Sequence, residues 1–322
     1  MTQASQDWRP TATRERLHLR ATLLARTRAF FAQRQVMEVD TPVLVNAAVT
    51  DPHIHSVPVA LTPHTLFLHT SPEYAMKRLL AAGAGDIYQI CHVARGFEQS
   101  RLHNSEFTLV EWYRLGFDLP QLMDEVAALV RELCPAHPAV MRPAERLTYR
   151  EAFGRHTGID PLTASIAELE GVVQHLGYRA AAAQRDELLD LIMGAVIGPR
   201  LGHEVLTFIH GYPASQAALA RLDPADPRTA QRFELYLAGV ELANGFRELA
   251  AAQEQRARFT QDLAARERLG LPLHLMDERL LAALEHGLPE CAGVAVGFDR
   301  VLMLAAGAAH ISEVLPFLTE TA

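Results

Sequence analysis

Hydrophobic residues recur at helical spacing at the start of the chain. Within residues 14–35, Leu19, Leu23 and Phe30 lie on one face, and arginines occupy much of the other. This arrangement is typical of an amphipathic helix. Residues 36–42 then read as a short strand that ends at a proline, which cannot donate a hydrogen bond to a sheet. The chain is therefore expected to open with a helix and a short strand.

Three consecutive residues mark the start of a second helix. Ser71 can cap it with a hydroxyl, Pro72 fits its first turn, and Glu73 lies near its positive end. Residues 65–69 read as a strand before it, and Gly83 can end it. The pattern predicts a strand that leads directly into a helix.

A hairpin with a long loop follows. Residues 86–94 and 106–114 are rich in β-branched and aromatic residues, and the segment between them is polar. Side chains alternate between the two faces of a strand, so every second residue of the second strand shares a face. These residues are Phe107, Leu109, Glu111 and Tyr113. A carboxylate and a phenol are therefore expected beside an aromatic ring.

The rest of the chain mixes helical and strand patterns. Residues 119–202 are mainly helical in pattern. Further strands are predicted at 204–210, 232–238, 240–245 and 293–297, and further helices at 250–269, 277–286 and from 299 onward. Strands in pairs between helical blocks, without a regular βαβ alternation, predict an α+β fold with a mostly antiparallel sheet flanked by helices.

The composition is that of an ordinary globular chain. Its 322 residues are 49% hydrophobic and 21% charged, enough to bury a large core. The net charge of −8, from 30 basic and 38 acidic residues, argues against a surface built to neutralise nucleic-acid phosphates. No stretch reaches the roughly 18 apolar residues of a membrane span, and the first residues lack an apolar signal segment. We therefore expect a cytoplasmic protein.

Cysteine and lysine usage adds two observations. Cys91, Cys134 and Cys291 are odd in number and far apart, which predicts ordinary reduced residues. Among the 30 basic residues Lys77 is the only lysine, so the other 29 are arginines. Genome composition accounts for such a bias. A structural role for Lys77 outweighs a chemical one, because a buried cation among acids serves packing and ion pairing.

Several common motifs are absent from the sequence. It has no GxxxxGK[ST] phosphate loop and no GxSxG nucleophile turn. Gly83 and Gly85 begin a GxGxxG pattern, but Tyr88 replaces the third glycine. His53 and His55 are not expected to bind a metal, because a pair of histidines is more often structural. Dinucleotide binding and zinc chemistry are therefore not supported.

Three separate segments combine side chains that nucleotide chemistry needs. The first begins at Arg95, whose guanidinium matches phosphate oxygens, and continues into polar and aromatic residues that can read or stack on a base. These are Glu98, Arg101, His103, Asn104 and Phe107. In the third segment Gly297 permits close approach of a ligand, and Arg300 stands at a helix start that favours anions. Taken alone, Arg300 could equally form a structural ion pair.

The second segment contains three carboxylates spaced seven residues apart. Glu234, Glu241 and Glu248 lie on both sides of Gly239, the turn between two predicted strands. Two such carboxylates can share Mg²⁺, which prefers a few carboxylates together with substrate phosphates. Any single glutamate could instead lie on a solvated strand face.

These segments carry a family resemblance. Arg95 with residues 103–107 resembles motif 2 of the class II aminoacyl-tRNA synthetases, and residues 293–300 resemble motif 3. Residues 39–42, after the long helix, resemble motif 1. The resemblance implies the class II catalytic fold, use of ATP and a homodimer joined through motif 1.

Within that class, residues 70–74 and 239–249 resemble lysyl-tRNA synthetases. Those enzymes carry an anticodon-binding domain before the catalytic domain, whereas here the catalytic helix begins almost at the N-terminus. We expect a catalytic domain at 14–320 with an extension at 1–13. This organisation is similar to the elongation factor P (R)-β-lysine ligases, which attach β-lysine to a lysine of that factor and need no tRNA. Ala295 agrees, because these ligases have alanine where lysyl-tRNA synthetases usually have glycine.

The resemblance implies a role for each matching residue. ATP would be bound by Arg95, Glu98, His103, Asn104, Phe107, Glu241, Leu242, Gly297 and Arg300. The lysine-like substrate would be bound by Ser71, Pro72, Glu73, Glu111, Tyr113, Glu248 and Ala295. Arg95 and Arg300 would act in catalysis by stabilising phosphate charge, and Glu234 and Glu241 would hold Mg²⁺.

One position departs from the family pattern. Motif 2 normally reads Arg-x-Glu with the glutamate on adenine, but Phe97 stands at that position and Glu98 follows it. One residue further along a strand faces the opposite way. The alternatives are therefore a ligase that charges another small acceptor with lysine, and a catalytically silent regulatory paralogue.

Overall fold

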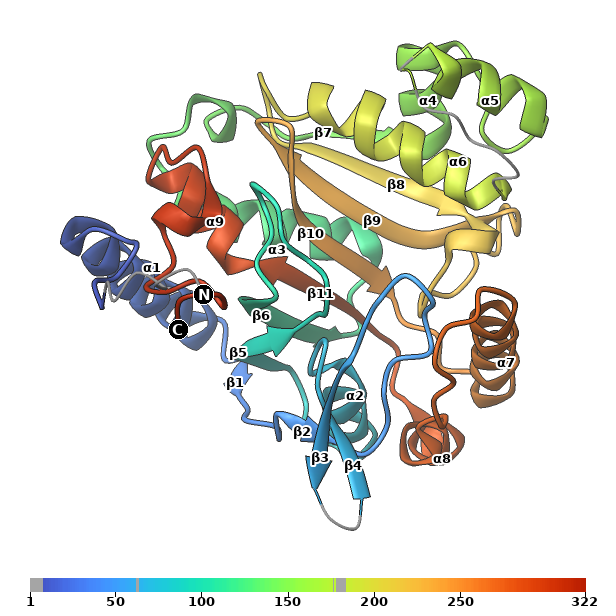
Figure 1. The fold of residues 1–322 in the computed structure, drawn as a ribbon, viewed down its shortest axis with the longest axis horizontal. Helices are drawn as coiled ribbons and strands as arrows, with labels where there is room; N and C mark the ends of the chain where they lie inside the picture. Colours follow the sequence, from blue (N-terminus) through green and yellow to red (C-terminus); the bar gives the residue numbers. More distant parts are fainter. Residues whose placement is uncertain (1–7, 62–63, 176, 178–183) are drawn as a thin grey trace, which may run out of the picture.

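An eight-stranded sheet forms the centre of the molecule (Figure 1). The computed structural model describes residues 8–61, 64–175, 177 and 184–322. In spatial order the strands are β1 (Met37–Glu38), β5 (Ile87–Ala94), β6 (Glu106–Leu115), β11 (Cys291–Gly297), β10 (Val240–Arg247), β9 (Thr229–Leu237), β8 (Thr207–Pro213) and β7 (Glu145–Thr148). The strands from β5 to β8 are antiparallel neighbours, and only the edge strands β1 and β7 pair in parallel. The predicted α+β fold with a mostly antiparallel sheet is confirmed.

Helices cover both faces of this sheet. They are α1 (Arg14–Gln33), α2 (Glu73–Ala81), α3 (Leu119–Leu133), α4 (Tyr149–Thr157), α5 (Ile166–Gln174), α6 (Arg185–Ile192), α7 (Ala252–Arg268), α8 (Glu278–Gly287) and α9 (Phe298–Ala305). On one face α1, α3 and α9 share a large core with the sheet, into which Val110 and Trp112 of β6 point. On the other face α2, α7 and α8 pack around Ile87 and Tyr113. The alternation along β6 therefore separates a core face from a second face that is free to build a site.

A small sheet and a side cluster complete the fold. The small sheet consists of β2 (Leu44–Val45), β4 (His64–Leu68) and β3 (Val57–Leu61), in that order. Helices α4 to α6 form a hydrophobic cluster of their own beside β7, β8 and β9, as Figure 1 shows. Among the described residues, no helix has both the length and the apolar character that crossing a bilayer requires.

Several predicted elements differ in extent from the structure. The segment at 119–202 contains the strand β7, and part of its alanine-rich stretch lies outside the described residues. The strand expected at 36–42 has only two residues, and the strand expected at 204–210 begins at Thr207. Pro72 is the N-cap residue of α2 rather than its first helical residue. The extents of these strands depend on pairing with distant parts of the chain, which local patterns do not encode.

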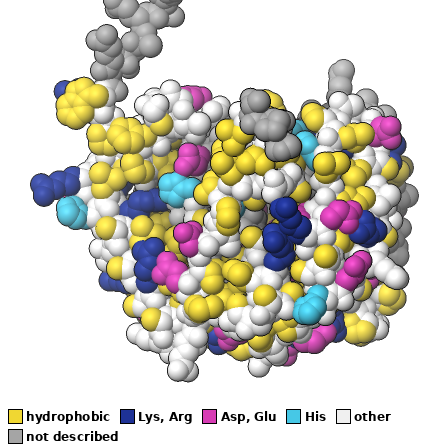
Figure 2. All heavy atoms as spheres, turned by 90° about the horizontal axis from the view of Figure 1, so that it is seen from below, with side chains coloured by type: hydrophobic (Ala, Val, Ile, Leu, Met, Phe, Trp, Pro, Cys, Tyr) yellow, Lys and Arg dark blue, Asp and Glu magenta, His cyan; other side chains and the backbone are white. Residues whose placement is uncertain are grey.

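The molecular surface carries both signs of charge. On the face seen in Figure 2, acidic and basic side chains are interspersed among hydrophobic ones and form no continuous basic area. This distribution agrees with the net charge of −8. It offers no broad track for a phosphate backbone on that face.

Candidate active site

A cavity of about 740 Å³ opens on the second face of the sheet. Alternate residues of β6 line it, as the hairpin pattern predicts. The other lining residues come from the start of α2, the loop after β5, the strands β10 and β11 and the first turn of α9. Sixteen of the predicted site residues are brought together here: Ser71, Pro72, Glu73, Arg95, Glu98, His103, Asn104, Phe107, Glu111, Tyr113, Glu241, Leu242, Glu248, Ala295, Gly297 and Arg300. Segments far apart in the sequence therefore converge on one space.

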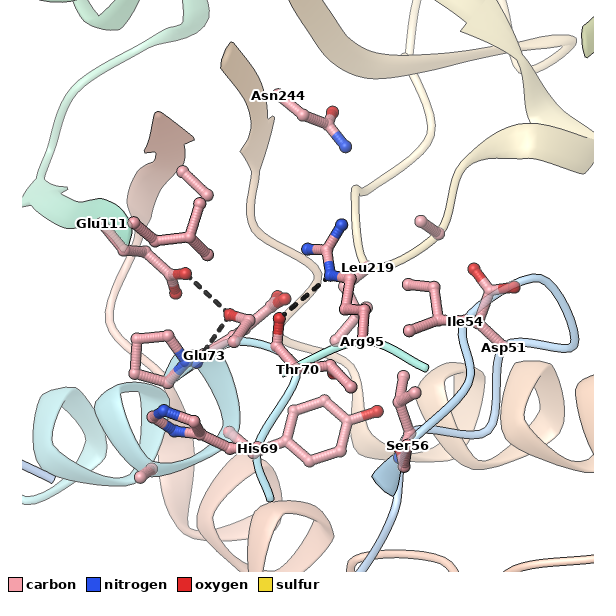
Figure 3. A pocket seen from close by; sticks show the side chains of 18 of the residues that line it. Asp51, Ile54, Ser56, His69, Thr70, Glu73, Arg95, Glu111, Leu219 and Asn244 are labelled. Carbon is pink, nitrogen blue, oxygen red and sulfur yellow. Dashed lines mark hydrogen bonds between the residues drawn. The ribbon is translucent and has the colours of Figure 1, made fainter. Parts of the chain in front are cut away.

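One end of the cavity is acidic. Glu111 is 2% exposed and accepts hydrogen bonds from Ser71 Oγ at 2.7 Å and Tyr113 Oη at 2.8 Å. Ser71 Oγ also accepts from the backbone N of Glu73, so one hydroxyl joins the helix start to the strand (Figure 3). Burial, together with the charge of Glu73, raises the pKa of Glu111 to about 8. This end of the cavity is therefore suited to bind a cation.

Lys77 lies directly behind that acidic end. Its Nζ is 2.7 Å from Glu73 Oε1 and 2.6 Å from Glu248 Oε2. A Cβ at Gly293 would lie 2.3 Å from the Tyr113 ring and 2.6 Å from Glu248 Oε1. The absence of a side chain at Gly293 is what allows Tyr113 and Glu248 to approach β11. Gly293, at the start of motif 3, therefore makes room for the amino-acid end. The sequence pattern alone did not reveal this role of Gly293.

The other part of the cavity is basic. Arg95 donates from Nε to the carbonyl of Thr70 at 3.2 Å, and its guanidinium carbon lies 5.1 Å from the ring centre of Phe107. Arg300 donates to the carbonyl of Glu241 at 2.8 Å and to His103 Nε2 at 2.6 Å. In Figure 3 the guanidinium of Arg95 points toward Asn244, away from Glu111. The cavity thus offers two guanidinium groups and an aromatic face, which suit a nucleoside phosphate.

His103 accepts from Arg300 because it is neutral. Burial and the nearby charges of Arg300 and Arg95 lower the pKa of His103 to about 4. A neutral imidazole can accept the arginine proton donor, whereas an imidazolium would repel it. The His103 contact therefore fixes one face of Arg300 at neutral pH.

Glu98 faces the cavity, as its predicted place in the ATP site requires, although strand alternation alone would turn it away. Phe97 has a φ of +64° and is 89% exposed, with its ring packed against His55. Glu98 lines the cavity and lies 3.9 Å from Arg95. The reason is that β5 ends at Ala94, so strand alternation no longer applies and the left-handed turn at Phe97 directs the next side chain inward.

Glu234 is placed differently from the other predicted residues. It does not line the cavity, and its oxygens accept from Arg232 and Tyr236, both at 2.6 Å. Glu241 is the carboxylate of this pair that reaches the cavity. Asn104 lines the cavity too, but its side-chain amide donates to Glu106 O at 2.7 Å and Thr319 Oγ1 at 3.0 Å.

Other cavity residues were missed from the sequence. They include Asp51, His69, Tyr74, Arg232, Asn244 and Asp277. Arg232 had a usable signal, since it shares a strand face with Glu234 at a spacing of two. Tyr74 and Asn244 lie inside the segments at 70–74 and 239–249 that resemble lysyl-tRNA synthetases, so they also had a signal. Asp51, His69 and Asp277 lie outside the helices and strands that border the cavity, and the sequence held no usable signal for them.

Comparison with known proteins agrees with this fold and site. The family model of class II tRNA synthetases (D, K and N) matches residues 1–321. The chain therefore has a class II synthetase catalytic domain, in which the sheet carries the cavity and motifs 2 and 3 line it.

The similarity to individual proteins is closer. The chain is 49% identical over 320 residues to the elongation factor P–(R)-β-lysine ligase of Vibrio vulnificus (strain YJ016), covering 97% of this chain and 98% of that protein. The elongation factor P–(R)-β-lysine ligases of Vibrio cholerae and Avibacterium paragallinarum are 49% and 44% identical to this chain. The match to the Vibrio cholerae protein covers 97% of this chain and 98% of that protein. The match to the Avibacterium paragallinarum protein covers 99% of this chain and 100% of that protein. This chain belongs to the family of elongation factor P–(R)-β-lysine ligases.

Proposed function

We propose that this chain condenses (R)-β-lysine, or lysine, with ATP and transfers the resulting acyl group to a lysine ε-amine of elongation factor P. The observation that carries the proposal is the separation of charge within one cavity. Glu73, Glu111 and Glu248 lie at one end and Arg95 and Arg300 at the other. A diamino acid presents ammonium groups to the first end, and ATP presents phosphates to the second. The ligation named for the relatives is the reaction that fits this arrangement.

In the first step, the substrate carboxylate attacks the α-phosphorus of ATP. An acyl–phosphate bond forms, and the bond to pyrophosphate breaks. Arg95 stabilises charge on the α-phosphate and Arg300 on the γ-phosphate, while Phe107 and Arg300 hold adenine between them. Glu73, Glu111 and Glu248 hold the ammonium groups, with the Tyr113 phenol beside them. The carboxylate is thereby aimed at phosphorus.

The residues present fit a magnesium ion. Glu241 reaches the cavity with a side chain that is 41% exposed, and Glu234 lies on the neighbouring strand. Mg²⁺ takes few protein carboxylates and completes its coordination with phosphate and water oxygens. When bound, it neutralises phosphate charge. Glu241 would hold it, joined by Glu234 if that carboxylate exchanges one of its present hydrogen bonds.

In the second step, the ε-amine of the acceptor lysine attacks the acyl carbon. An amide bond forms, AMP leaves with the electron pair of the broken bond, and the amine gives up a proton. The acceptor reaches the acyl carbon through the open side of the cavity, since the ammonium groups of the first substrate are bound at the closed, acidic end.

Two competing functions remain: a ligase for another small acceptor and a catalytically silent paralogue. Arg95, Glu241, Glu248 and Arg300 all line one cavity, and Glu98 joins them despite the change at position 97. A silent paralogue has no need of this set. The two acceptor classes differ in the product, since only one leaves a mass increase on elongation factor P.

A homodimer in the cytoplasm is part of the proposal. Met37, Val43 and Leu44, on either side of residues 39–42 that resemble motif 1, are 49%, 46% and 40% exposed. Exposed apolar residues along one edge are typical of a subunit interface. Sedimentation velocity at micromolar concentration measures the association, and a monomer alone would contradict it.

ATP–pyrophosphate exchange tests the first step. We expect exchange with (R)-β-lysine, weaker exchange with α-lysine and none without an amino acid. If no amino acid supports exchange, the chain is a silent paralogue and Phe97 is the first residue to revert to glutamate.

A further inference from the structure

Lys77 has a position that the proposed mechanism does not yet use. It is the only lysine among 30 basic residues, and it is 1% exposed on α2. Its Nζ bridges Glu73 Oε1 and Glu248 Oε2 at 2.7 and 2.6 Å. Both of these carboxylates line the cavity. Lys77 therefore holds two elements, α2 and the end of β10, in a fixed relation at the amino-acid end.

The charges around Lys77 can be counted. Lys77 interacts with Glu73, Glu248 and Cys291, and Glu111 and Tyr113 in turn interact with those two carboxylates. Three of these are carboxyl groups and Lys77 supplies one ammonium, so the cluster has a net charge of −2 once all three carboxyl groups are ionised. Because the pKa of Glu111 is raised to about 8 and that of Glu248 to about 7, this state is reached when the ammonium groups arrive and protons leave. A diamino acid brings two ammonium groups, and its carboxylate points to the arginine end. The charges of this cluster and of the two ammonium groups are equal and opposite.

We propose that Lys77 is a specificity-determining residue of the amino-acid pocket. Lys77 holds Glu73 and Glu248 in place and cancels one of the three carboxylate charges. The net negative charge that remains at this end of the cavity selects substrates with two ammonium groups over those with one. The inference rests on the proposed function and deepens it.

The chemistry of the position favours lysine over arginine. A compact ammonium can donate to Glu73 and Glu248 from one atom, whereas a planar guanidinium needs more space in a gap that is closed to solvent. Burial opposes the charge on Lys77, but Glu248 and Glu73 outweigh it and raise its pKa. Negative charge still exceeds positive charge around Glu248. Burial and the charge of Glu73 raise the pKa of Glu248 to about 7, although Lys77 acts to lower it.

The test compares variants that separate charge from packing. Lys77→Met keeps most of the volume and loses the charge, and Lys77→Ala leaves a space that propylammonium or propan-1-ol can fill. Arg34→Met is the control, because it removes the cation that lies 3.7 Å from buried Glu125, away from the cavity. Pyrophosphate exchange gives the KM for ATP, for the preferred diamino acid and for norleucine, which lacks the second ammonium.

We expect Lys77→Met to raise the KM for the diamino acid at least about tenfold, the equivalent of one charge-assisted hydrogen bond, and to reduce selection over norleucine equally. The KM for ATP stays near that of the wild type. Propylammonium restores Lys77→Ala and propan-1-ol does not, while Arg34→Met changes only thermal stability. A wild-type KM and selectivity in Lys77→Met, or equal rescue by the alcohol, would overturn the inference.

A measurement on the unmodified protein covers the case in which the variants do not fold. Calorimetry at pH 7 in two buffers of different ionisation enthalpy counts the protons released on binding. Arrival of two ammonium groups should expel protons from Glu111 and Glu248, and norleucine should expel fewer. Equal release for the two ligands would overturn the inference. Failure of the proposed function is distinguishable, because the wild type itself would then neither bind nor activate a diamino acid.

Discussion

Glu98 lies in the cavity because the backbone turns at Phe97. Its carboxylate is within reach of the nucleotide end, 3.9 Å from Arg95. We predict that Glu98→Ala raises the KM for ATP about tenfold, since a half-buried hydrogen-bond acceptor for the ligand is lost, with little change in the KM for the amino acid. Gln99→Ala, at an exposed neighbouring residue, is the control. An unchanged KM in Glu98→Ala would mean that adenine is read by other groups.

Gly293 sets the depth of the amino-acid end. A methyl group there would lie 2.3 Å from the Tyr113 ring and would push both that ring and Glu248 out of place. We predict that Gly293→Ala raises the KM for the amino acid at least about tenfold while the KM for ATP stays within about twofold. Gly171→Ala is the control, because it adds a methyl group to helix α5 where no atom lies within 4 Å. Equal kinetics in the two variants would contradict the steric explanation.

At the scale of elements, α9 is held to the rest of the fold by its first turn. Asp299 is 1% exposed, accepts from Thr108 N at 2.6 Å and pairs with Arg20 of α1 at 2.5 Å. Arg300 is the next residue, so this anchor also orients the guanidinium in the cavity. Arg20→Met should lower the free energy of unfolding by about 3 kcal/mol and raise the KM for ATP, because Asp299 loses its cation.

The control for this anchor is Arg28→Met on the same helix. Arg28 pairs with Glu38 at 3.1 Å, and both side chains are largely exposed. Such a pair contributes about 0 to 1 kcal/mol, so little change is expected in chemical denaturation. If Arg20→Met lowered the free energy of unfolding as little as Arg28→Met, the pair of Arg20 with Asp299 would not stabilise the fold.

Strands with a strong local pattern were predictable from the sequence, and short strands that depend on their partners were not. The hairpin of β5 and β6 was predictable because both strands are strongly patterned, and β10 and β11 were predictable for the same reason. Sixteen of the predicted site residues line one cavity. Motifs 2 and 3, the segments at 70–74 and 239–249 and the alternation of the strand after motif 2 pointed to them. The edge strand β7 and the small strands β2 and β3 are short and are defined by their partners. The sequence did not reveal how Glu98 reaches the cavity, because a positive φ at Phe97 has no local signature.

At the scale of the whole molecule, the chain has almost no side-chain amine that could react with an adenylate bound in its own cavity. Its one lysine is buried and paired on two sides, and its 29 arginines do not lose their protons. We predict that incubation with ATP and the amino acid alone adds no acyl group to a side chain. Arg279→Lys, at a residue that lines the cavity, should gain one lysyl unit, whereas Arg146→Lys on β7 should not. Acylation of Lys77 itself would contradict its place in the fold.

The central claim is that a cavity with an acidic end and a basic end joins a diamino acid to a protein lysine. The most direct test is intact mass and peptide mapping of elongation factor P after incubation with this chain, ATP and (R)-β-lysine. We predict a gain of one lysyl unit on a single lysine of the factor, dependent on ATP and lost in Arg300→Ala. An unmodified factor, in a reaction where pyrophosphate exchange proceeds, would contradict it and direct the search to another acceptor.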